Sequence, residues 1–163
     1  MVRAVERIAA VEYLRRDQYA EDAGPMAHPV RPDEYQEINN FYTATVYEKG
    51  AEVIAMLKRL VGDAAYEKAL TLYFDRHDGE AATCEDFVKA IEDGAQIDLT
   101  RFRRWYSQAG TPRVTARGRY DAPTRTYTLG FEQHSAPTSG RGDKLPHVIP
   151  MAIGLLTRDG RAL

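Results

Sequence analysis

Apolar residues recur at helical spacing through most of the first 109 residues of the chain. A first helix over 2–16 is predicted by residues that repeat with a period near 3.6, namely Val5, Ile8, Val11 and Leu14. A second helix is expected to begin between Tyr42 and Thr45 and to end at Val61. Three prolines within residues 25–32 exclude a helix between the two and predict an extended path.

Helix signals continue after residue 61. Gly62 is expected to end the second helix as a C′ glycine, and Asp63 to cap the next one. Residues 83–86 read Thr-Cys-Glu-Asp, which resembles a capping box before a further helix. A last helix is expected from Asp98, with apolar side chains on one face: Leu99, Phe102, Trp105 and Tyr106.

The pattern changes from helical to extended at residues 110–112. Segments 114–120 and 126–131 predict two strands around a turn at 121–124. Segment 148–156 predicts a third strand, and Asp159-Gly160 indicates a hairpin turn after it. Three strands cannot close a β-sandwich, and we therefore expect this second domain to be incomplete.

Composition and charge exclude several classes of protein. The 163 residues include 22 basic and 24 acidic side chains, a net charge of −2 that does not favour a nucleic-acid partner. No apolar run approaches the roughly 20 residues needed to span a bilayer, so no membrane partner is expected. The single Cys84 fits a reducing compartment, and residues 1–16 lack a signal-peptide core, so we expect a cytoplasmic protein.

Candidate chemistry is sparse when the residues are considered alone. The sequence contains no His-Glu-x-x-His or Cys-x-x-Cys motif, and its four histidines are far apart, so no metal site is expected. No obvious base accompanies Cys84, which argues against a catalytic cysteine. Tyr42 and Tyr47 flank a helix start, where a phenol can point into a cleft as a hydrogen-bond donor. The alternative is that both rings only pack, with their hydroxyls at the surface.

A family resemblance changes the weight of these alternatives. Residues 46–50, Val-Tyr-Glu-Lys-Gly, resemble the Tyr-Glu-Lys-Gly segment of the M1 zinc aminopeptidases, which are gluzincins. Other blocks resemble that family in the same order along the chain, at 20–29, 37–43, 73–79 and 102–112. The bacterial aminopeptidase N branch is the most similar, and the resemblance runs from about Arg3 to the end of the chain.

The resemblance implies an α+β multidomain fragment. Residues 1–110 would be the C-terminal helical part of a thermolysin-like peptidase catalytic domain. Residues 111–163 would be the N-terminal portion of an Ig-like β-sandwich domain. The missing N-terminal half of the catalytic domain would then be the main partner of this chain.

The resemblance also implies a chemistry, the removal of N-terminal residues from peptide substrates. Zinc and its ligands would belong to the full-length parent enzyme, with none bound to this chain, which alone is expected to be inactive. By its place in the motif, Tyr47 would be the catalytic tyrosine that stabilises the oxyanion. Tyr42 and Asn39 would contact substrate, and the turn at 27–29 would line the same cleft. The alternative function is a non-catalytic, degenerate homologue that binds peptides or partners.

Overall fold

A computed structural model describes residues 2–138 and 142–162. Its elements are α1 (Val2–Tyr13), the π-helix η1 (Leu14–Gln18), α2 (Tyr19–Ala23), the 3₁₀-helix η2 (Ile38–Phe41), the π-helix η3 (Thr45–Lys49), α3 (Gly50–Val61), α4 (Asp63–His77), α5 (Cys84–Ala95), α6 (Arg104–Ser107), β1 (Arg113–Asp121) and β2 (Thr126–His134). The chain divides into two compact units, Met1–Ile54 with Asp98–His147, and Ala55–Ile97 with Val148–Leu163.

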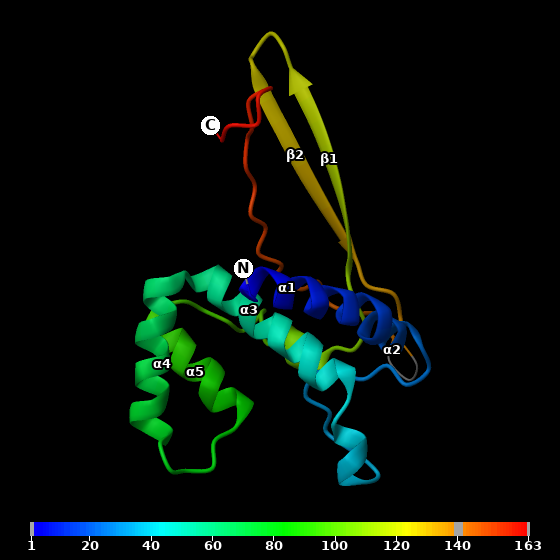
Figure 1. The fold of residues 1–163 in the computed structure, drawn as a ribbon, viewed down its shortest axis with the longest axis vertical. Helices are drawn as coiled ribbons and strands as arrows, with labels where there is room; N and C mark the ends of the chain where they lie inside the picture. The colour runs from blue at the N-terminus through cyan, green and yellow to red at the C-terminus, as the bar shows by residue number, and fades with distance from the viewer. Residues whose placement is uncertain (1, 139–141, 163) are drawn as a thin grey trace. The chain divides into compact units, whose positions relative to one another are not determined.

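The first unit begins with one unbroken helical run over residues 2–23, coloured blue in Figure 1. The predicted helix over 2–16 is therefore present but continues through η1 and α2. Its early apolar side chains remain open to solvent, with Val2, Val5 and Ile8 between 61% and 70% exposed. The proline-rich segment after Gly24 contains no helix up to Ile38, as predicted.

The rest of the first unit holds buried aromatic residues and a hairpin. The last predicted helix is shorter than expected, because residues 100–103 form turns and α6 covers only Arg104–Ser107. Its four apolar side chains are nevertheless buried, each at most 6% exposed: Leu99, Phe102, Trp105 and Tyr106. Strands β1 and β2 pair antiparallel from Arg113 opposite His134 to Asp121 opposite Thr126, which confirms the predicted hairpin (Figure 1).

The second unit is built on the antiparallel pair α4 and α5, which lie side by side in Figure 1. A Cβ added to Gly94 would lie 2.6 Å from the Cα and Cβ of Ala69, so glycine lets the two helices approach closely. The capping box is confirmed, since Thr83 and Asp86 exchange side-chain to backbone hydrogen bonds. Asp63 does not cap α4: Gly62, at φ 83°, occupies that position and no side chain caps the helix.

The predicted strand at 148–156 is wrong. The described part of this segment pairs only through an isolated bridge between Leu156 and Ala162. The turn predicted at Asp159-Gly160 does form, because the Gly160 N–H donates to the carbonyl of Thr157. No helix in the described part of the chain is long and apolar enough to cross a membrane.

Candidate functional site

The structure brings Tyr42 and Tyr47 together. Tyr47 lies in the π-helix η3, and its ring stacks on that of Tyr42 with centroids 6.1 Å apart and an interplanar angle of 30°. Both residues are 58% exposed, so neither ring is a core residue in this chain. Both phenols are therefore accessible from solvent in this chain, and the choice between a site role and packing against further chain stays a prediction.

Local hydrogen bonds explain why the helix starts just before Tyr47. The hydroxyl of Thr43 accepts from the Val46 N–H at 3.1 Å, and the carbonyl of Thr43 accepts from the Tyr47 N–H at 3.1 Å. A threonine hydroxyl that satisfies an unpaired N–H in the first turn is a characteristic N-cap. Thr43 therefore sets the start of the helix at Ala44, within the range predicted from sequence.

Asn39 lies three residues before Tyr42 in the chain. It belongs to η2, is exposed, and its carbonyl accepts from the Tyr42 N–H at 3.4 Å. Phe41 packs edge to face on Tyr42 with ring centroids 6.1 Å apart, which orders the same segment. The chain thus places Asn39, Tyr42 and Tyr47 along one connected stretch, while their roles toward substrate stay a prediction.

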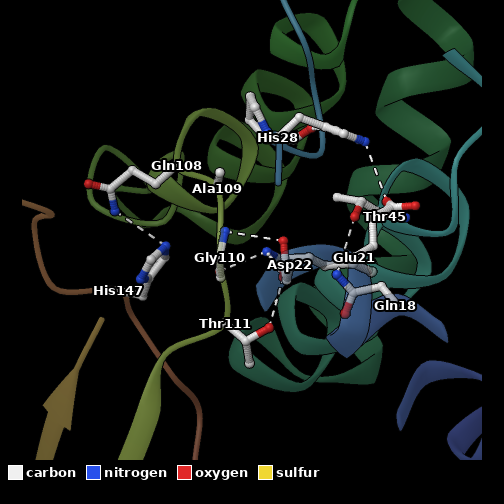
Figure 2. A network of polar contacts seen from close by, with 12 residues as sticks. Gln18, Glu21, Asp22, His28, Thr45, Gln108, Ala109, Gly110, Thr111 and His147 are labelled. Carbon is white, nitrogen blue, oxygen red and sulfur yellow. Dashed lines mark hydrogen bonds and ion pairs between the residues drawn. The ribbon is translucent and has the colours of Figure 1, made fainter. Parts of the chain in front are cut away.

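Sequence reasoning did not identify the buried partners of Lys49, which lies two residues after Tyr47. The ammonium of Lys49 donates to Asp22 Oδ2 and to the carbonyl of Gly110, both at 2.8 Å. Asp22 also accepts from the Gly110 N–H at 3.1 Å and from the Thr111 hydroxyl at 2.8 Å (Figure 2). Gly110 adopts φ 85°, a conformation that favours glycine. This buried polar cluster joins α2, η3 and the segment that leads into β1.

Burial and charge act in opposite directions on this cluster. Burial by itself raises the pKa of Asp22, but the charge of Lys49 and hydrogen bonds from Lys49, Gln18 and Thr111 outweigh it and hold that pKa below 3.8. Burial lowers the pKa of the Lys49 ammonium, and the Asp22 carboxylate opposes that shift. Because each charge has several matched partners, we infer that the pair is ionised.

A second set of contacts joins α2 to the start of η3. Glu21 Oε1 accepts from the Thr45 N–H at 2.9 Å, and Gln18 donates from Nε2 to the Thr45 hydroxyl at 3.3 Å (Figure 2). His28 Nε2 lies 3.4 Å from the same Glu21 oxygen, and Nδ1 donates to the carbonyl of Pro29 at 2.9 Å. The structure thus places the predicted 27–29 turn against Glu21, and whether it lines a substrate cleft stays a prediction.

A signal for the buried cluster was present in the sequence. Lys49 lies three residues after Val46 and four before Val53, on the apolar face of its helix. A lysine there is fully buried only when it is paired. Its partner could not be read in the same way, because Asp22 lies 27 positions earlier in the chain.

The described histidines do not form a metal site. Within residues 2–138 and 142–162, no three His, Cys, Asp or Glu side chains are grouped as metal ligands. His147, 3% exposed, packs on Trp105 with ring centroids 4.2 Å apart. Burial and then the positive charges of Lys49, Arg104 and Lys144 lower its pKa to about 4. The described residues therefore offer no ligand set that fits a zinc ion.

Two family descriptions match the chain in sequence order. Residues 4–106 match the peptidase family M1 domain. Residues 110–163 match a domain of unknown function, DUF3458, with an Ig-like fold. This order agrees with the fold class predicted from sequence, a helical peptidase part followed by the start of a β-sandwich.

The curated relatives are longer than this chain. Aminopeptidase N of Escherichia coli strain K12 is 53% identical over 99% of the chain, which spans 18% of that protein. Aminopeptidase N of Caulobacter vibrioides is 55% identical over 98% of the chain, again 18% of that protein. A crystal structure of Legionella pneumophila aminopeptidase A in complex with aspartic acid superposes with a TM-score of 0.63 at 27% identity, covering 69% of this chain and 13% of that one.

Proposed function

Because the chain belongs to peptidase family M1, we propose that it is the tyrosine-bearing part of a zinc aminopeptidase that removes N-terminal residues from peptides. The proposal rests on the position of Tyr47. Its neighbours Thr45 and Lys49 are held by buried contacts, while its own ring is 58% exposed. A phenol on an anchored helical turn is held in place, which is one requirement of a preorganised hydrogen-bond donor.

The role of Tyr47 follows from the chemistry of peptide hydrolysis. Attack on a peptide carbonyl places negative charge on its oxygen, and a neutral phenol can donate a hydrogen bond to that oxygen. Such a donor stabilises the transition state more than the ground state, so it raises kcat rather than binding alone. Tyr42, stacked on Tyr47, and Asn39 are proposed to contact substrate beside the reacting carbonyl.

We propose that residues 1–110 form the C-terminal helical part of the catalytic domain and that residues 111–163 begin the β-sandwich domain. The zinc ligands and the remainder of the catalytic domain would lie outside this chain, in a cytoplasmic enzyme. Exposed apolar side chains on α1, including Val2, Val5 and Ile8, support a further packing partner of this kind. The isolated chain should then be inactive and prone to association.

The test is an assay of the full-length protein on an aminoacyl anilide and on peptides. Turnover should release free N-terminal residues, fail on N-acetylated peptides, stop after chelation and return with zinc. The isolated chain, dialysed and measured in parallel, should hold no stoichiometric zinc and show no turnover. A zinc-replete full-length protein without peptidase activity would support the non-catalytic alternative, and a tightly held zinc with turnover in the isolated chain would contradict the proposed division.

A further inference from the structure

The turn that carries Tyr47 is held by one side of a single helix. Gln18, Glu21 and Asp22 are spaced at i, i+3 and i+4 in the run η1–α2, so their side chains share one face. All three contact η3: Gln18 and Glu21 at Thr45, and Asp22 at Lys49. We call these three residues the α2 clamp.

The clamp holds both ends of η3 and leaves its middle open. Thr45 and Lys49, the first and last residues of η3, are 0% and 5% exposed. Tyr47 lies midway between them and is 58% exposed. The same short helix therefore has one anchored face and one face that presents the tyrosine. π-helical turns are rare in proteins, and those that occur often lie at functional sites.

Glu21 controls the end at which this helix begins. The first N–H groups of a helix have no partner inside it, and each needs an external acceptor. Thr43 serves the N–H groups of Val46 and Tyr47, but the Thr45 N–H is bonded by Glu21 Oε1, from a segment 24 residues earlier. A carboxylate at this point also interacts favourably with the positive end of the helix dipole.

We propose that Glu21 is a positioning residue for Tyr47, acting through the backbone of the helix start rather than by touching substrate. This inference rests on the proposed function of Tyr47. Asp22 fixes Lys49 but also holds Gly110 and Thr111, so its loss would disturb more than the tyrosine. Glu21 also lies 3.4 Å from His28 Nε2, but its bond to the Thr45 N–H bears directly on where the turn begins.

The test is a double-mutant cycle in the full-length enzyme that combines Glu21→Ala with Tyr47→Phe. Glu21→Ala should lower kcat about tenfold with KM nearly unchanged, since small misplacements of a catalytic group cost up to about 10²-fold. In the Tyr47→Phe background the same change should alter kcat less than about twofold, because the group it positions has gone. Glu21→Gln, which keeps an acceptor oxygen, should restore most of the rate.

Two controls separate positioning from general damage. Glu12→Ala removes an exposed carboxylate from the same helical run and should leave kcat unchanged. Hydrogen exchange should show faster opening of the Thr45 to Tyr47 amides in Glu21→Ala, and near-normal protection in Glu21→Gln. If Glu21→Ala does not fold, Glu21→Asp replaces it in the cycle, since its shorter side chain withdraws the oxygen from the Thr45 N–H while keeping the charge.

The outcomes distinguish this inference from the function on which it rests. A full loss in both backgrounds, or no loss when Tyr47→Phe alone is costly, would overturn the positioning role and leave the catalytic tyrosine intact. If Tyr47→Phe itself is silent, the proposed function of Tyr47 fails and the positioning role fails with it. A loss that appears only when Tyr47 keeps its hydroxyl, and that Glu21→Gln rescues, is the result we expect.

Discussion

Two aspartates in this chain hold cationic side chains in different ways. Asp22, in the first unit, is 5% exposed and accepts from Lys49, the Gly110 N–H and the Thr111 hydroxyl. Asp93, in the second unit, has a side chain 32% exposed and accepts from Arg76 and Lys89, both at 2.8 Å. The partners are chemically similar, but only the first set is removed from water.

The difference lies in what each set of contacts decides. Asp93 bonds Lys89 one turn away in its own helix and Arg76 on the adjacent α4, which are already paired by packing around Ala69 and Gly94. Asp22 instead joins segments that lie 27 and 88 positions away in the sequence, so its bonds hold together distant parts of the first unit. A buried ion pair is weak evidence of net stability, yet removing one partner is costly. We therefore expect the first unit to depend on its polar cluster and the second on helix packing.

The largest effect is expected from Lys49→Met, which leaves the buried Asp22 carboxylate without its cation. Breaking a buried pair in this way typically costs roughly 3–5 kcal/mol. The loss should appear as faster hydrogen exchange across Thr45–Lys49 and at Gly110 in the full-length protein. Lys89→Met, which removes a partner of the exposed Asp93, is the matched control and should change exchange in α5 very little. Equal effects of the two substitutions would break the comparison.

Acid should weaken the first unit before it affects α4 and α5. His147 has a pKa of about 4 in the folded chain against 6.5 ordinarily, so the unfolded state binds the proton first. Above pH 6.5 the imidazole is neutral in both states and does not affect the free energy of unfolding. As the pH falls toward 4, the unfolded state gains the proton and the free energy of unfolding decreases by up to roughly 3 kcal/mol. NMR titration of the imidazole and exchange at the His147 amide test this, and a titration near 6.5 would contradict it. Asp22 adds a further loss only below pH 3.8.

The second unit should respond most to a change in helix packing. Gly94→Ala places a methyl group 2.6 Å from Ala69, an overlap that we expect to cost about 1–3 kcal/mol. Gly50→Ala is the control, because it is also helical and its added Cβ would meet Val30 at an ordinary 3.5 Å. Exchange of the α4 and α5 amides measures the effect of Gly94→Ala, and exchange of the α3 amides measures that of Gly50→Ala. A stabilised Gly94→Ala variant would show that the close approach is not needed.

The sequence predicted those features that depend on neighbouring residues. Three local patterns were predicted and are present in the structure. They are the capping box at Thr83, the glycine that follows α3 at position 62, and the β1–β2 hairpin. The family resemblance was also confirmed. It rested on a short motif together with the order of the other matching blocks, whereas the helix that carries Tyr47 was predicted from its apolar pattern.

Features that depend on distant partners were not predictable in this way. The π-helical turns at Leu14–Gln18 and Thr45–Lys49 carry ordinary helical spacing, and their contact with each other through Gln18 and Thr45 is tertiary. The 148–156 segment has strand-like residues, but a strand also requires a paired neighbour, and the described chain supplies only the Leu156 to Ala162 bridge. Asp63 was predicted to cap α4, but it is the first residue of that helix because Gly62 occupies the capping position.

The most direct measurement compares Tyr47→Phe and Tyr42→Phe in the full-length enzyme by steady-state kinetics, with zinc quantified alongside. Each substitution removes one hydroxyl and keeps a ring in the stacked pair, so packing should survive. Tyr47→Phe should lower kcat and kcat/KM together by roughly 2.7–4 kcal/mol of transition-state stabilisation, with KM little changed. Tyr42→Phe should cost less, and zinc content should be the same in both. A Tyr47→Phe enzyme with near-normal kcat, or with only a raised KM, would contradict the catalytic role and make Tyr47 a packing residue.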